Sequence, residues 1–115
     1  MTHFNPYEAG LDLLSPNRNF APITAALDDD GSLMIGGCRL SSLAEKYGTP
    51  LYVLDEKTIR TACQAYRLAL EKYYSGQSLV LYASKANSSL AISSLIASEG
   101  LGLDAVSEGE LITAF

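Results

Sequence analysis

Cysteine, positive charge and long apolar runs are all scarce in this sequence of 115 residues. The two cysteines, Cys38 and Cys63, show no metal-ligand spacing, so neither a zinc site nor a disulfide framework is predicted. No uninterrupted run of about 18 apolar residues occurs, which argues against a membrane-spanning helix. The opening residues also lack the basic and apolar regions of a signal peptide. We therefore expect a cytoplasmic protein whose two cysteines are reduced and pack in its interior.

The shortage of positive charge argues against a nucleic-acid-binding protein. The chain has 8 lysine and arginine residues against 13 aspartate and glutamate residues, which gives a formal net charge of −5. Binding to nucleic acid requires a basic surface that neutralises phosphates, and the sequence has no basic stripe of that kind. A nucleic-acid partner is therefore not expected.

The residues that are present divide the chain into three parts. Residues 1–22 contain three of the four prolines and no clear period, which is typical of an irregular N-terminal extension in which His3 is solvated. Residues 23–48 predict a β-hairpin followed by a short helix. Residues 49–115 show a regular alternation of strand and helix patterns.

The second part carries clear turn and cap signals. Asp30 and Gly31 separate two short apolar runs, which predicts a hairpin between residues 23 and 36. Ser42 and Glu45 have the spacing of a capping box, and Gly48 stands where a left-handed residue would end the helix.

The third part predicts three successive β-α units. Apolar strands are expected at residues 51–54, 78–84 and 101–107. Helices are expected to begin at Asp55, at Ser88 or Ser89, and at Ser107, where Glu110 completes a capping box. Because a helical crossover returns the chain in the same direction, the strands are predicted to be parallel.

This order of elements fits either a (β/α) barrel or an open doubly wound sheet. No glycine-rich dinucleotide fingerprint follows any of the strands, which argues against a Rossmann domain. A barrel needs about 250 residues, so three units cannot close one, and an open sheet would leave its last strand unpaired. We therefore expect the N-terminal part of a larger α/β protein.

Residues that could carry chemistry lie at the carboxyl ends of the predicted strands, where functional groups gather in both architectures. Lys85 follows the second strand, Asp104 lies on the third, and Glu110 follows one turn later. A partly desolvated lysine in such a position can attack a carbonyl to form a Schiff base. Structural interpretations remain open, because Lys85 can snorkel to water and both carboxylates can serve turns or caps. Asp55 is expected only to cap its helix.

Alternation along the strands adds one expectation about the space near these residues. Lys85 shares a strand face with Ala83, and Asp104 shares a strand face with Gly102. If these faces point into a barrel, the small residues Ala83 and Gly102 leave room for a bound ring.

Three segments resemble a single enzyme family. "YGTPLYVLDE" (47–56), "LYASKAN" (81–87) and "EGLGLDAVSEGEL" (99–111) occur in the order, and at the spacing, found in the N-terminal third of the diaminopimelate decarboxylases. These enzymes belong to the alanine-racemase-like, fold-type III group that uses pyridoxal phosphate. The resemblance covers about residues 32–115 of this chain, and the residues before it are not diagnostic.

The resemblance implies a cofactor, a reaction and a fold. Lys85 matches the lysine that binds pyridoxal 5′-phosphate covalently, and Asp104 and Glu110 match acidic residues that line or order the cofactor pocket. The implied reaction converts meso-2,6-diaminopimelate to L-lysine and CO2, the last step of lysine biosynthesis, in a homodimer. The implied fold is a (β/α)8 barrel, of which residues 49–115 would form the first three βα units. The hairpin would join a C-terminal β-domain outside this sequence.

Several parts of such an enzyme are expected outside these residues. They include the glycine-rich phosphate-binding loop, the acidic partner of the pyridine nitrogen, and an intersubunit cysteine that neither cysteine here matches. We therefore expect the chain by itself to be inactive and poorly folded. Two alternatives remain open: a related decarboxylase for ornithine, arginine or a polyamine precursor, and a non-catalytic relative that binds pyridoxal phosphate.

Overall fold

The computed structural model describes residues 20–114 and divides the chain into two compact units, Met1–Ile59 and Arg60–Phe115. Most of the predicted extension at residues 1–22, including His3, lies outside the described residues. Within the described part, no helix is both long enough and apolar enough to cross a membrane. Each unit is described in turn.

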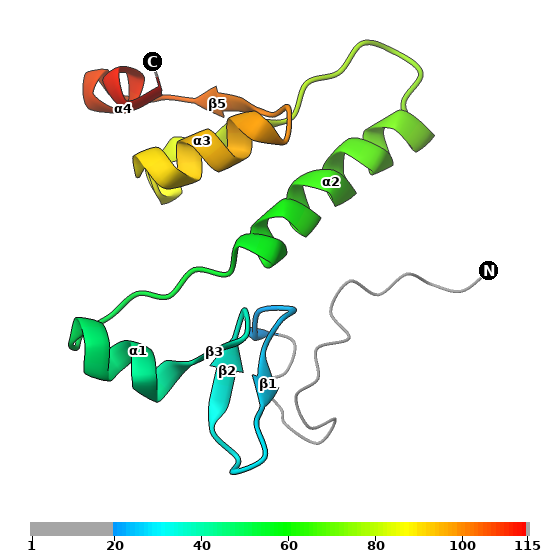
Figure 1. Cartoon of the computed structure of the whole chain (residues 1–115). Coiled ribbons are helices and arrows are strands. Elements are labelled where there is room, and N and C mark those ends of the chain that lie inside the picture. Colours follow the sequence, from blue (N-terminus) through cyan, green and yellow to red (C-terminus); the bar gives the residue numbers. More distant parts are fainter. Residues whose placement is uncertain (1–19, 115) are drawn as a thin grey trace. The chain divides into compact units, whose positions relative to one another are not determined.

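The first unit contains the predicted hairpin. Strand β1 (Ala26–Leu27) pairs antiparallel with β2 (Leu33–Ile35), which confirms a hairpin between residues 23 and 36. A third strand, β3 (Cys38–Arg39), extends the sheet beyond β2 (Figure 1). Two residues are too few to show alternation, so no sequence pattern predicts β3. Cys38 lies on this edge strand and is exposed, so the prediction that both cysteines are packed is wrong for Cys38.

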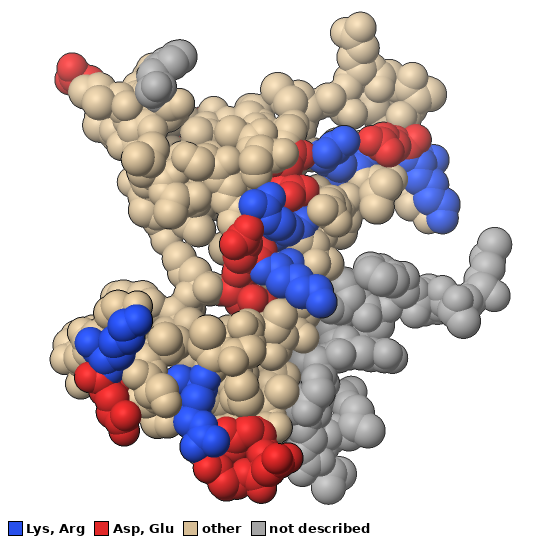
Figure 2. Space-filling view, viewed as in Figure 1, with Lys and Arg blue, Asp and Glu red and all other residues tan. Residues whose placement is uncertain are grey.

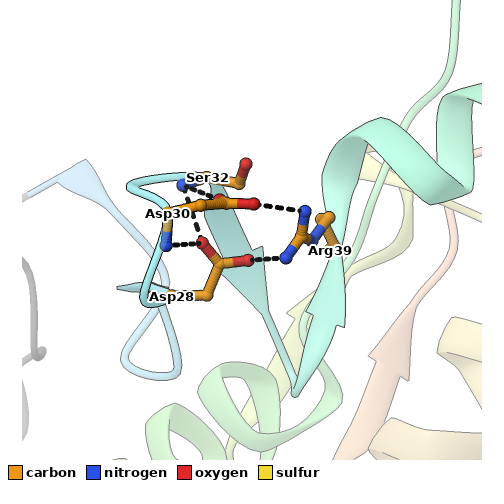
Figure 3. Close-up of polar contacts among 4 residues, drawn as sticks. All are labelled: Asp28, Asp30, Ser32 and Arg39. Carbon is orange, nitrogen blue, oxygen red and sulfur yellow. Dashed lines mark hydrogen bonds and ion pairs between the residues drawn. The ribbon is translucent and has the colours of Figure 1, made fainter.

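A polar cluster fixes the hairpin turn (Figure 3). Asp28 Oδ1 accepts hydrogen bonds from the N–H groups of Asp30 at 3.2 Å and Ser32 at 2.9 Å. The guanidinium of Arg39 reaches back from β3 and pairs with Asp28 at 2.6 Å and with Asp30 at 2.7 Å. Gly31 adopts a φ of 80°, which glycine tolerates without steric cost. These contacts explain the aspartate-rich turn as a structural feature of the hairpin.

Helix α1 (Leu40–Tyr47) begins three residues earlier than a cap at Ser42 would place it. Its N-cap is Arg39, and no side chain makes the capping hydrogen bond, so the predicted capping box of Ser42 and Glu45 is wrong. The C-terminal prediction is confirmed, because Gly48 has a φ of 83° and its N–H donates to the carbonyl of Ala44.

The predicted strand at residues 51–54 does not form. Within the described part of the chain these residues pair with no strand, and Tyr52 is 97% exposed. An apolar run becomes a strand only where a neighbouring strand supplies hydrogen bonds, and the described residues provide none here. The sequence pattern could not show this, because it records apolar character and not the presence of a partner.

Asp55 caps the next helix, α2 (Glu56–Tyr73), as predicted. Its Oδ2 accepts a hydrogen bond from the N–H of Thr58 at 3.2 Å and another from the Thr58 hydroxyl. Burial raises the pKa of Asp55, but hydrogen bonds from Thr58 and Thr24 outweigh this effect, so the pKa lies below its ordinary value. The Thr58 hydroxyl oxygen also accepts the N–H of Ile23 at 2.9 Å, which connects the cap to the segment before β1.

The second unit contains a parallel β-α-β arrangement. Its elements after α2 are β4 (Leu81–Ala83), α3 (Leu90–Ser98), β5 (Gly102–Asp104) and α4 (Glu108–Ala114). Strands β4 and β5 pair in parallel, which confirms the predicted direction, although both are shorter than expected. The buried residues Cys63, Ile92, Ile96 and Leu101 form the core of this unit. Burial and the charge of Glu99 raise the pKa of the Cys63 thiol, as expected for a packing residue.

The end of α3 is closed by a Schellman motif. Gly100 has a φ of 77°, its N–H donates to the carbonyl of Ala97, and the next N–H, of Leu101, donates to Ile96. The predicted end of this helix at Gly100 is therefore confirmed. The carboxylate of Glu99 joins this end to α2, because Arg60 donates to it at 2.6 Å and Gln64 at 3.1 Å.

Charged side chains of both signs are interspersed on the visible surface (Figure 2). Acidic and basic groups lie next to each other on the face shown, which carries no extended basic area.

Candidate functional site

The carboxyl ends of β4 and β5 meet at one edge of the small sheet. The parallel register pairs Leu81 with Gly102 and ends with Ala83 opposite Asp104. Beyond Ala83 the chain leaves the strand and turns through a short 3₁₀ helix, Ser84–Ala86. Lys85 is the central residue of this turn, so the structure brings it close to the end of β5 as the sequence predicts.

The side chain of Lys85 is exposed. The predicted strand alternation does not apply to it, because β4 ends at Ala83 and Lys85 lies in the turn that follows. An amine on a short turn at the end of a strand is accessible to a small molecule, while its backbone stays attached to the sheet. This arrangement suits a lysine that reacts with a carbonyl group.

The residue before Lys85 is buried and makes two polar contacts. Ser84 is only 2% exposed, and its hydroxyl lies 2.8 Å from the backbone carbonyl oxygen of Asp104 and 2.8 Å from Glu110 Oε2. These contacts connect the turn to β5 and to the first turn of α4. The sequence pattern pointed to Lys85, Asp104 and Glu110 but not to Ser84.

Hydrogen bonds also fix the residues that follow Lys85 in the chain. The hydroxyl of Tyr82 on β4 donates to the backbone carbonyl of Asn87 at 3.3 Å. The side-chain oxygen of Asn87 accepts the N–H of Ser89 at 3.0 Å, just before α3 begins at Leu90. Lys85 is therefore flanked on both sides by residues that are tied to the protein.

Glu110 serves both as part of a helix cap and as a partner of the Lys85 turn. Its N–H donates to the Ser107 hydroxyl at 3.3 Å, as in the predicted capping box, and its Oε2 accepts the N–H of Val106 at 2.7 Å. Hydrogen bonds from Val106 and then Ser84 lower the pKa of Glu110, and the positive charge of Lys85 adds a smaller effect in the same direction. The carboxylate is thus held ionised within electrostatic reach of Lys85.

Asp104 contributes to this cluster through its backbone rather than its side chain. Its carbonyl oxygen accepts the Ser84 hydroxyl, while its carboxylate is exposed at the end of β5. A Cβ atom built at Gly102 would lie 2.5 Å from Leu81 Cδ2, so a neighbouring side chain lies against this glycine. The prediction that Ala83 and Gly102 leave room for a ring concerns faces that point into a closed barrel, and it stays a prediction.

No group of three or more potential metal ligands occurs among residues 20–114. The chemistry available at this edge of the sheet is that of an exposed amine, a half-buried carboxylate and an exposed carboxylate. A primary amine of this kind suits covalent attachment of an aldehyde.

Comparison with known proteins identifies relatives for this region. The family model described as "Pyridoxal-dependent decarboxylase, pyridoxal binding domain" matches residues 56–115. A diaminopimelate decarboxylase of Synechocystis sp. is 52% identical over 99 residues, which cover 86% of this chain and 21% of the relative. One from Methanothermobacter thermautotrophicus is 47% identical over 88 residues, covering 76% of this chain and 20% of the relative.

Solved structures give the same result. The crystal structure of diaminopimelate decarboxylase from M. jannaschii has a TM-score of 0.73 and 41% identity, over 79% of this chain and 21% of that chain. A second structure of that protein, in complex with L-lysine, has a TM-score of 0.66 over the same shares of the two chains. The chain thus spans about a fifth of the length of the relatives it matches. The chain belongs to the pyridoxal-dependent decarboxylase family, and its residues 56–115 match the family's pyridoxal-binding domain.

Proposed function

We propose that the complete protein containing these residues is a diaminopimelate decarboxylase, which converts meso-2,6-diaminopimelate to L-lysine and CO2. The observation that carries this proposal is the position of Lys85, exposed on a fixed turn at the carboxyl end of β4 and inside the segment that matches the pyridoxal-binding domain. Support for the substrate comes from the relatives, since those compared at 40–52% identity are diaminopimelate decarboxylases.

The residues present fit pyridoxal 5′-phosphate at its aldehyde end. Lys85 offers the primary amine that would hold the aldehyde, and Glu110 places a negative charge within electrostatic reach of that amine. When bound, pyridoxal phosphate acts as an electron sink for the carbanion left by loss of CO2.

The chain's own residues have separate roles in this proposal. Lys85 would hold the cofactor through its side-chain amine, and the Glu110 carboxylate would keep a negative charge near that amine. Asp104, exposed at the end of β5, is proposed to line the cofactor pocket. The fixed turn keeps the backbone of Lys85 in place.

The wider architecture is also part of the proposal. Residues 49–115 would form the start of a (β/α)8 barrel, with residues 51–54 pairing as its first strand once the rest of the barrel is present. The hairpin at residues 23–36 would join a C-terminal β-domain, and the complete enzyme would be a homodimer. The antiparallel strands β1–β3, which belong to a different sheet from β4 and β5, support a separate role for the hairpin.

The test is a substrate comparison on the complete protein, expressed from its full coding sequence and supplied with pyridoxal phosphate. We expect L-lysine and CO2 from diaminopimelate, and no comparable turnover of ornithine or arginine. Replacing the lysine by Lys85→Arg keeps the positive charge but removes the reactive amine, so turnover should fall by about 10⁴-fold or more. The control Lys72→Arg changes an exposed lysine on α2 and should leave turnover unchanged. Preferential decarboxylation of ornithine or arginine would contradict the proposed substrate.

A further inference from the structure

The hydroxyl of Ser84 occupies an unusual position next to the lysine of the candidate site. Ser84 is 2% exposed and directly precedes Lys85, whose side chain is exposed. A buried hydroxyl is costly unless it makes hydrogen bonds, and both atoms within reach of it belong to neighbouring elements. They are the carbonyl oxygen of Asp104 on β5 and Oε2 of Glu110 on α4, each 2.8 Å away.

These contacts begin where the strand pairing ends. The last pair in the parallel register is Ala83 with Asp104, and Ser84 is the first residue of the turn that carries Lys85. A contact to the Asp104 carbonyl therefore continues the connection between the two strands by one residue after backbone pairing has stopped. Without it, the turn would be tied to β5 only through Ala83.

The second contact fixes the carboxylate of Glu110. Both neighbours of the hydroxyl are acceptors, and the hydroxyl has one proton to share between them. Glu110 Oε2 also receives the N–H of Val106 at 2.7 Å, so one carboxylate oxygen is held from two sides. The same hydroxyl thus contacts both the backbone of β5 beside the lysine turn and the carboxylate of Glu110.

We propose that Ser84 is a positioning residue for Lys85, acting through the Asp104 carbonyl and the Glu110 carboxylate. This inference rests on the proposed function, because it assigns Ser84 a role in presenting Lys85 to pyridoxal phosphate. The hydroxyl is buried and has two protein partners, so Ser84 acts on the cofactor only through its neighbours and is not itself a catalytic residue.

The test uses two serine-to-alanine variants of the complete protein. Ser84→Ala removes the hydroxyl beside Lys85, and Ser93→Ala removes one from a serine on α3 that is 5% exposed and therefore similarly buried. Three quantities are measured for each variant: the dissociation constant of pyridoxal phosphate by visible absorption, kcat and KM for diaminopimelate at saturating cofactor, and the melting temperature.

Cofactor affinity and kcat distinguish a positioning role of Ser84 from a role in stability alone. In Ser84→Ala the cofactor dissociation constant should rise about tenfold, the size of effect expected from losing a hydrogen bond to a charged group. In the same variant kcat should fall while KM stays unchanged, because the buried hydroxyl does not face the substrate. Ser93→Ala should bind cofactor and turn over substrate like the unsubstituted protein, even if its melting temperature drops as far.

Two further outcomes decide against the inference. If Ser84→Ala matches Ser93→Ala in cofactor affinity and kcat, Ser84 is only a structural residue. If the unsubstituted protein forms no cofactor linkage at Lys85, the proposed function fails, and this inference fails with it; that failure is seen before any variant is made. Should Ser84→Ala not fold, Glu110→Gln tests the same connection from the other side, and unchanged cofactor affinity in that variant would overturn the inference.

Discussion

At the residue scale, the position of Lys85 is determined by the residues around it. Ser84 is buried against β5 and α4, and Asn87 is bound to Tyr82, so the two sides of the turn are held while the lysine side chain is exposed. A reactive amine benefits from this arrangement, because a fixed backbone limits the positions that the amine samples. The lysine needs no strong contact of its own.

Asp55, the charged cap of α2, gives a prediction about how the stability of the protein depends on pH. Asp55 has a lowered pKa in the folded protein, so its ionised form stabilises the fold above the ordinary aspartate pKa of about 3.9, and this contribution is lost as the pH falls through the folded value. Asp55→Asn keeps a capping side chain but has no titratable group. The complete protein carrying Asp55→Asn should therefore lose less stability than the unsubstituted protein between about pH 5 and pH 2.

Thermal unfolding at a series of pH values measures this difference. Asp29→Asn, which changes an exposed aspartate of the hairpin turn, is the matched control and should follow the unsubstituted protein. Asp55→Ala, which removes the cap altogether, should cost about 1 kcal/mol at neutral pH. Parallel pH profiles for Asp55→Asn and the unsubstituted protein would show that the Asp55 charge does not contribute.

Residue types at strand ends were the most informative part of the sequence. Lys85, Asp104 and Glu110 lie together at one edge of the sheet, as their spacing predicted. Ser84 was missed because its partner Glu110 is 26 residues away, and no local pattern records such a contact. The capping-box pattern predicted the contact between Glu110 and Ser107 within the helix cap. It could not predict the contact between Glu110 and Ser84.

At the element scale, helices followed their sequence signals more closely than strands. The periodicity and caps of α2, α3 and α4 depend on residues within each helix, and these helices form where predicted. Strands depend on partners elsewhere in the chain. Residues 51–54 have the composition of a strand but remain unpaired within the described part, and β4 and β5 end where their shared register ends.

The Schellman motif gives an element-scale prediction. Gly100 has a φ of 77°, a conformation that costs a residue with a side chain about 1–2 kcal/mol. Gly109 lies inside α4 without a positive φ, and a Cβ atom there would meet no other atom within 4 Å. Gly100→Ala should therefore destabilise the complete protein by about that amount, whereas Gly109→Ala should be neutral or stabilise it by up to about 1 kcal/mol.

Denaturant unfolding of the two glycine variants provides the comparison. Both replace one glycine by alanine in the same unit, so the difference between them reports the backbone conformation rather than the added methyl group. Equal losses of stability would contradict the assignment of Gly100 as the left-handed residue that ends α3.

At the scale of the whole molecule, the described residues expose a large apolar surface. Tyr52, Leu54, Leu90 and Ile112 are among many large apolar side chains that are more than half exposed. The chain also spans only about a fifth of the length of its relatives. In the proposed architecture, further strands and helices of the barrel would cover these side chains, which would explain why sequence patterns for buried strands occur at exposed positions.

A prediction about the chain alone follows from this surface. The isolated 115 residues should be poorly folded and inactive, because much of their apolar surface is exposed. Purified and mixed with pyridoxal phosphate, the isolated chain should show no stable visible absorption from a lysine-bound cofactor. A stable band that disappears in Lys85→Ala would contradict this prediction and show that residues 1–115 bind the cofactor by themselves.

The central claim is that Lys85 is the residue that holds pyridoxal phosphate. Its most direct test is to treat the complete protein with pyridoxal phosphate and borohydride, which reduces the linkage between cofactor and amine to a stable bond, and to locate the label by peptide mass spectrometry. We expect a single labelled peptide that contains Lys85, and no such label in Lys85→Arg. Equal labelling of an exposed lysine elsewhere, such as Lys57 or Lys72, or no label at Lys85, would contradict it.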